Sequence, residues 1–156
     1  MAYQKLQAGE ALAVIPSDTI RVPNPAAIAD TGTAAAPTGA QLVGTGTTFT
    51  KSVRVGDIVY DTTNSVVATV DAIVSDTVLT TSAAIATGAS YVIYSQANNP
   101  SNGCVLYVGV AGDVKVKMVG GNDVVFKGAT AGSFLPINVL QVFATGTTAT
   151  DIVALW

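Results

Sequence analysis

The side chains in this 156-residue chain that could do acid–base chemistry are almost all carboxylates, because the sequence contains no histidine. Two close pairs exist, Asp57 with Asp61 and Asp71 with Asp76, and paired carboxylates can act as general acid and base. Each of these residues falls where a turn is expected, and aspartate commonly accepts hydrogen bonds from the backbone of its own turn. We therefore interpret all four as turn residues and predict no catalytic residue and no enzyme activity.

Metal and cofactor sites are not indicated either. A calcium loop needs a dense run of oxygen ligands that ends in glutamate, and Glu10 is the only glutamate. Cys104 is the only cysteine, and we interpret it as a small buried hydrophobe. The glycine-rich stretches 44–49 and 128–133 lack the complete spacing of phosphate-binding loops and do not lie between a strand and a helix. We predict neither a metal nor a cofactor.

The low charge of the chain limits its partners. Charged residues make up 11% of the sequence, roughly half the share in an average soluble domain. Seven basic residues against ten acidic ones cannot neutralise a run of phosphates, so nucleic acid is not an expected partner. Lys115, Lys117 and Lys127 could form a small basic patch on one hairpin, although a solvated sheet face explains them more simply.

The composition also narrows the class of protein. Hydrophobic residues make up 49% of the chain, mostly alanine and valine beside abundant threonine and glycine, which favours a β protein and argues against disorder. A coiled coil would need more Glu, Lys, Arg and Leu. No apolar run approaches the roughly 18 residues of a membrane span, and the N-terminus lacks the apolar core of a signal peptide. We expect a soluble protein, made in a cytoplasm, with no membrane partner.

The elements that must position these residues are short strands separated by turns, at intervals of about 8 to 12 residues, which is typical of small antiparallel barrels and sandwiches. Residues 41–98 form one self-contained series of strands. Residues 1–25 and 99–156 supply the strands of a second series, and a loop at 96–103 separates the two series. Ala, Thr, Gly and Pro dominate 26–40, which we interpret as an extended arm or linker. The predicted fold is all-β: an antiparallel β-sandwich or jelly-roll-like module formed by the N- and C-terminal segments, with an inserted small β-barrel.

A series of motifs occupies the two ends of the chain. The series consists of Ile-Pro-Ser-Asp-Thr at 15–19, Tyr-Val-Gly at 107–109, Gly-Asp at 112–113, Leu-Pro at 135–136 and Ala-Thr-Gly-Thr-Thr-Ala-Thr-Asp-Ile-Val-Ala at 144–154, before a terminal Trp156. It resembles a module found in virion proteins of tailed bacteriophages and in the head-spike base proteins of phage-like gene transfer agents. Residues 26–98 depart from that module as an insertion, in which Val53–Tyr60 resembles a small β-barrel of other phage structural proteins.

The resemblance implies a structural virion protein of a tailed phage, without catalytic or cofactor-binding residues, made in the host cytoplasm and located on the capsid surface. The expected function is that of a decoration (cement) protein, which binds the major capsid protein, forms a homo-oligomer such as a trimer, and stabilises the head. The alternative is a vertex head-spike base, neck or tail adaptor protein that anchors a fibre. A third possibility, an enzyme that uses carboxylates, has no substrate that we can name.

Two groups of residues are expected to serve such a structural role. The first group would lie in the module core or at a subunit interface, and its members are Phe134, Phe143 and Trp156. The second group belongs to the arm, expected to contact capsid or neighbouring subunits, and its members are Pro23, Asn24, Pro25 and Pro37.

Overall fold

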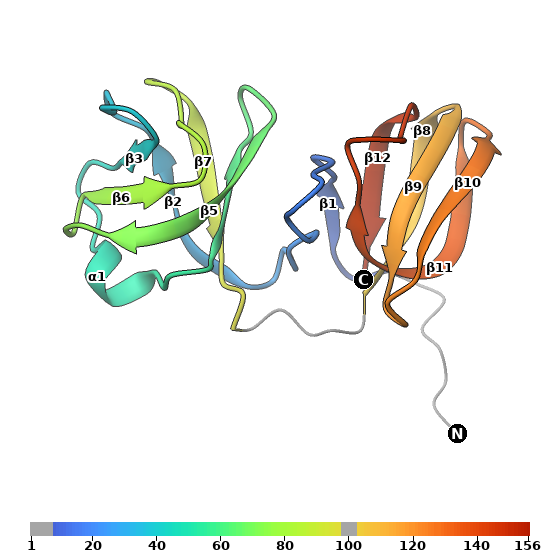
Figure 1. The fold of residues 1–156 in the computed structure, drawn as a ribbon. Helices are drawn as coiled ribbons and strands as arrows, with labels where there is room; N and C mark the ends of the chain where they lie inside the picture. The colour runs from blue at the N-terminus through green and yellow to red at the C-terminus, as the bar shows by residue number, and fades with distance from the viewer. Residues whose placement is uncertain (1–7, 98–102) are drawn as a thin grey trace. The chain divides into compact units, whose positions relative to one another are not determined.

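The structure is a computed structural model that describes residues 8–97 and 103–156 (Figure 1). Every strand pairing is antiparallel, and among the described residues α1 (Phe49–Ser52) is the only α-helix. The prediction of an all-β fold is confirmed. The chain divides into two compact units, Met1–Pro25 with Pro100–Trp156 and Ala26–Asn99. Residues 98–102, the centre of the loop predicted to separate them, lie outside the described part.

The first unit is a six-stranded sheet built from both ends of the chain. In spatial order its strands are β1 (Ala11–Ala13), β12 (Thr150–Leu155), β8 (Cys104–Val110), β11 (Ser133–Val142), β9 (Gly112–Met118) and β10 (Asp123–Ala129). The first half of β11 pairs with β8 and its second half with β9, and both registers shift near Val139. Because β11 changes partner along its length, the sheet bends there.

The core of the first unit follows from the alternation of its strands. In β9 the apolar residues Val114 and Val116 are fully buried, whereas Lys115 and Lys117, which alternate with them, point to the other face. Leu106 of β8 and Ala154 of β12 are register partners and are also fully buried. Burial of a valine or leucine side chain such as Val114 or Leu106 contributes on the order of 1.5–3 kcal/mol.

The second unit is another six-stranded sheet, in the order β2 (Ile28–Thr33), β7 (Ser90–Tyr94), β4 (Ile58–Asp61), β5 (Val66–Ile73), β6 (Val78–Thr81) and β3 (Gln41–Val43). A bridge between Ala35 and Val43 joins the chain after β2 to the opposite edge strand, β3, so the sheet curls toward a barrel. Its core includes Phe49 of α1 and Tyr91 of β7, whose rings pack edge to face with centroids 6.5 Å apart.

The interpretation of 26–40 as an arm or linker is wrong. β2 lies inside this segment and pairs with β7, with Thr31 opposite Val92. Ala34 then donates a backbone hydrogen bond to the carbonyl of Ala89, 2.8 Å away, and is buried. The segment is an integral part of the second unit because its backbone groups pair with a strand far along the chain, which composition does not reveal.

Candidate functional site

The carboxylates of Asp57 and Asp61, which could have formed an acid–base pair, accept hydrogen bonds from nearby backbone N–H groups, most of them in their own turns. Asp61 is fully buried; its Oδ1 accepts hydrogen bonds from the backbone N–H groups of Thr63 and Asn64, 2.9 and 2.8 Å away, and its Oδ2 accepts one from the Asn64 amide. Asp57 is buried and accepts the N–H groups of Arg54 and Gln96, at 2.8 and 3.0 Å. These carboxylates stabilise loops by accepting backbone hydrogen bonds.

Asp71 and Asp76 are exposed. Asp76 lies in the predicted turn between β5 and β6, whereas Asp71 lies inside β5, so the interpretation of Asp71 as a turn residue is wrong. Oδ1 of Asp71 accepts a hydrogen bond from the hydroxyl of Thr69 at 3.0 Å. Oδ1 of Asp76 accepts the backbone N–H and the hydroxyl of Thr50, which fastens the turn at 75–77 to α1. Among residues 8–97 and 103–156 no cluster of three acidic or cysteine side chains could hold a metal ion.

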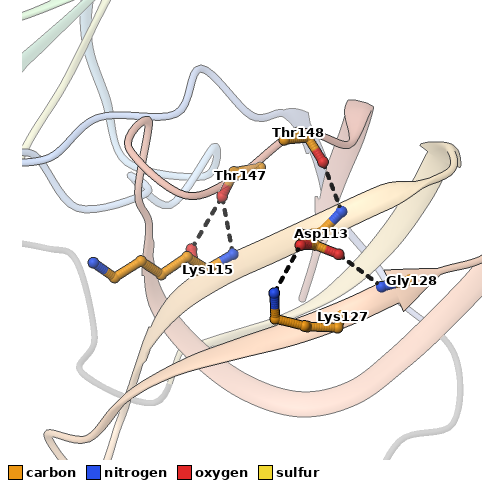
Figure 2. Close-up of polar contacts among 6 residues, drawn as sticks. All are labelled: Asp113, Lys115, Lys127, Gly128, Thr147 and Thr148. Atoms are coloured by element: carbon orange, nitrogen blue, oxygen red, sulfur yellow. Dashed lines mark hydrogen bonds and ion pairs between the residues drawn. The ribbon is translucent and has the colours of Figure 1, made fainter.

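A polar cluster of the first unit lies around Asp113, where three segments meet (Figure 2). The Asp113 N–H donates to Oγ1 of Thr148 at 2.9 Å, and the Asp113 carbonyl accepts the N–H of Thr148 at 2.8 Å. The Asp113 carboxylate accepts the N–H of Gly128 at 2.9 Å and lies 3.6 Å from Nζ of Lys127. One residue of β9 therefore ties down both the end of β10 and the loop before β12.

Thr147 repeats this connection one step further along β9. Its Oγ1 accepts the N–H of Lys115 at 2.9 Å and lies 3.3 Å from the Lys115 carbonyl, to which it can donate (Figure 2). The Gly-Asp and Thr-Thr motifs are thus two halves of one backbone clamp. The clamp holds the strands in position.

Two glycines of the motif series sit where another strand leaves no room for a side chain. A Cβ on Gly112 would lie 2.4 Å from the backbone nitrogen of Ala149. A Cβ on Gly109 would lie 2.6 Å from the carbonyl oxygen of Asp151, a non-glycine residue with φ of 53°. The contacts are with backbone, which cannot move aside easily, so glycine is required at both positions.

A further pair joins the N-terminal motif to the closing one. Asp18 accepts the N–H and the hydroxyl of Thr145, at 2.9 and 2.7 Å. The hydrogen bond from the Thr145 hydroxyl is the main cause that lowers the pKa of the Asp18 carboxyl, and the Thr145 N–H and the Lys115 charge add to it. The segments that carry the resemblance are therefore physically joined in one unit.

Apart from the exposed Asp151 of β12, which lies beside Gly109, the outward side of the strands β1, β12, β8 and β11 carries no charged side chain. Its positions, called the apolar face below, follow from the registers of these strands and are Ala11, Ala13, Val105, Tyr107, Phe134, Pro136, Val153 and Leu155. Phe134 and Tyr107 are direct register partners whose rings lie 5.3 Å apart, and Phe134 is 62% exposed. The charges of β9 and β10 lie elsewhere, on the outward side of that hairpin.

The three aromatic residues expected in the core or at an interface lie in three different environments. Trp156 packs against the core of the first unit, and its backbone N–H donates to the Glu10 carbonyl at 3.0 Å. Phe143 is 9% exposed, with Nζ of Lys115 4.8 Å and Nζ of Lys117 5.8 Å from its ring centroid. Phe134 belongs to the apolar face and not to the core, so only its surface role remains as a prediction.

The residues assigned to the arm do not form one segment. Pro23 is buried and Asn24 and Pro25 are partly buried at the end of the N-terminal part of the first unit. Pro37 follows the bridge residue Ala35 in the second unit. Tyr107, the aromatic partner of Phe134, was not among the residues predicted for the core or interface group. The nearly continuous apolar run at 105–108 is the signal that could have indicated a strand with apolar side chains on both faces.

The remaining reactive groups are shielded. Burial raises the pKa of the Cys104 thiol to about 12, and its Sγ lies 3.4 Å from the Val139 carbonyl. Burial, with the Asp30 charge, raises the pKa of Tyr91 to about 12.

Within the described ranges, no helix has the length and apolar character needed to cross a bilayer. No protein-family model, curated protein or solved structure matches the chain.

Proposed function

We propose that this protein is a structural component of a tailed-bacteriophage virion, a decoration protein that binds the outside of the capsid and stabilises the head. The observation that carries the proposal is the joining of the motifs that resemble virion modules. Asp18 of the N-terminal motif bonds Thr145 of the closing motif, and Asp113 bonds Thr148. The two residues of each pair lie far apart in the sequence, and their contacts bring the motifs together in one folded unit.

The distribution of charge in the first unit supports a binding role. The apolar face offers Phe134 and Tyr107 to a partner, whereas Asp113, Lys117 and Asp123 lie on the outward side of β9 and β10. Phe134 is the exposed large hydrophobic side chain of this face, and its larger apolar neighbours are partly buried. Exposed apolar surface of this kind can mark a protein interaction site. In this proposal the apolar face contacts the major capsid protein, the charged side of the β9–β10 hairpin faces solvent, and copies of the chain assemble as a homo-oligomer on the virion.

The proposal is tested by binding to capsid shells assembled without this chain. We expect saturable co-sedimentation and a rise in the temperature at which the shells come apart. Phe134→Ser should weaken binding by about tenfold or more, since an aromatic anchor at an interface is worth roughly 2 kcal/mol. Val74→Ser is the matched control, because Val74 is 61% exposed in the second unit.

The outcomes separate the alternatives. Absence of binding to the shells would overturn the decoration role. Saturation at the vertices, the neck or the tail alone would instead favour a vertex head-spike base or an adaptor that anchors a fibre. If Phe134→Ser bound the shells as tightly as the natural chain does, the apolar face would not be part of the contact.

A further inference from the structure

β10 is an edge strand of unusual accessibility. It has seven residues and no proline, and β9 is its only neighbour among the strands of the described sheet. Val124 and Val125 are 38% and 41% exposed. Natural proteins usually protect such an edge, since its unpaired backbone groups can bind a strand of another chain.

The direction of the unpaired backbone groups follows from the hairpin. The N–H of Met118 donates to the carbonyl of Asn122 at 2.8 Å, so this is a hydrogen-bonded pair. Antiparallel registers alternate between hydrogen-bonded and non-hydrogen-bonded pairs. The register of β10 with β9 is regular from Asp123 to Phe126 and shifts between Phe126 and Ala129. In the regular part the even-numbered residues bond to β9, and the odd-numbered ones, Asp123 and Val125, direct their backbone groups to the free edge. Lys127 follows where the shift begins, and its side chain lies on the same side of the sheet as Asp113.

We propose that two copies of this chain pair through β10, antiparallel, across a two-fold axis at Val125. Val125 then faces Val125 of the second copy, and the two residues exchange both backbone hydrogen bonds. Asp123 faces Lys127 of the second copy, and the symmetry repeats this pair on the other side of the axis. On the opposite side of the sheet, Val124 lies across from Phe126 of the second copy and extends the apolar core.

Charge complementarity selects this register. Within one copy Nζ of Lys117 lies 2.7 Å from Asp123, and Nζ of Lys127 lies 3.6 Å from Asp113. At the contact between the two copies, four charged side chains would lie side by side with alternating sign. They are Lys117 and Asp123 of one copy, followed by Lys127 and Asp113 of the other. A two-fold axis at Asp123 or at Lys127 would place like charges directly opposite, which is destabilising. An edge lysine usually blocks pairing, but here Lys127 meets a carboxylate.

This pairing does not rest on the proposed virion function, because it needs only copies of the chain. A two-fold contact uses the same strand in both copies and closes at a dimer. The dimer would have twice the 15.7 kDa mass of one chain, that is 31.4 kDa, and the pairing differs from the trimer expected from the resemblance. An edge-to-edge contact is smaller than a standard interface, so we expect reversible association over roughly 1 µM to 1 mM.

Charge-reversal complementation tests the proposal on the full chain. Lys127→Glu places Asp123 of each copy opposite a glutamate, and Asp123→Lys places Lys127 of each copy opposite a lysine. Each variant alone should dimerise about tenfold more weakly or worse. In an equimolar mixture both pairs between the copies become attractive again, so sedimentation should recover the dimer. Weak association in the mixture, equal to that of either variant alone, would overturn the proposal.

A second variant and a second measurement guard against folding defects. Val125→Pro removes only an N–H directed to the free edge, and should give a monomer with an unchanged circular dichroism spectrum, whereas Val125→Thr keeps that N–H and should dimerise. Amide exchange should show the N–H groups of Asp123 and Val125 protected more strongly as concentration rises, while that of Val124 stays protected throughout. A natural chain that stays monomeric to 1 mM, or forms a trimer with unprotected Val125, contradicts the pairing.

Discussion

Asp18 and Thr145, 127 residues apart in the sequence, are joined by two hydrogen bonds that both end on the Asp18 carboxylate. Because the ionised carboxylate is the better acceptor, folding lowers the pKa of Asp18 below its ordinary value of 3.8. This contribution to stability is present above the ordinary pKa and is lost as the pH falls through the lowered one.

The first prediction concerns this acid dependence. Asp18→Asn should make the midpoint of thermal unfolding less sensitive to pH between about 5 and 2 than in the natural chain. Thr145→Ser, which keeps the hydroxyl, is the control and should keep the natural slope. Thermal melts by circular dichroism at stepped pH measure it, and identical slopes for Asp18→Asn and the natural chain would show that this pair carries none of the acid dependence.

The second prediction concerns the close approach at Gly112. Gly112→Ala should destabilise the first unit by about 1–3 kcal/mol, because the new Cβ would meet the backbone of Ala149, which cannot move without disturbing the clamp at Asp113. Gly120→Ala is the control, since nothing lies within 4 Å of the added carbon. Urea unfolding of both variants measures the effect. If Gly112→Ala and Gly120→Ala had the same free energy of unfolding, the backbones at Gly112 and Ala149 would move apart at little cost.

The third prediction separates core from surface among the aromatic residues. Trp156→Ala should lower the free energy of unfolding by about 2–3 kcal/mol, since Trp156 packs against the core of the first unit. Phe134→Ser should change it by no more than about 0.5 kcal/mol, because Phe134 is 62% exposed. Denaturant unfolding measures both. If Trp156→Ala left stability and assembly unchanged, its assignment to the core would fail.

The fourth prediction concerns the hydroxyl of Tyr91, which is buried and has no hydrogen-bond partner among the described residues. Tyr91→Phe should leave stability unchanged or raise it by up to about 1 kcal/mol, because it removes a desolvated polar group without opening a cavity. Tyr91→Leu, which removes the ring, should cost about 2 kcal/mol or more. A large loss in the phenylalanine variant, measured by urea unfolding, would reveal a partner for the hydroxyl.

Local pattern allowed much of the fold to be predicted. Alternation at 114–118 and the turn residues at 120–123 define the β9–β10 hairpin, because the side chains that decide it are neighbours in sequence. The segment 26–40 was misinterpreted because β2 is stabilised by pairing with β7, which lies far along the chain.

The site was harder to predict for a related reason. The run at 105–108 predicts a strand, but only its register with β11 places Tyr107 beside Phe134 on the outward face. The bond between Asp18 and Thr145 likewise depends on how the two ends of the chain meet. The clamp at Asp113 combines backbone groups from three segments, which no spacing within one segment indicates.

The number of copies of this chain per virion tests the proposed function most directly. Quantitative mass spectrometry of purified particles, with the major capsid protein as the internal reference, measures it. A decoration protein that covers the shell should be present in hundreds of copies. A handful of copies, in a multiple of five or six, would contradict shell decoration and place the protein at a vertex or the tail, and its absence from particles would contradict any virion role.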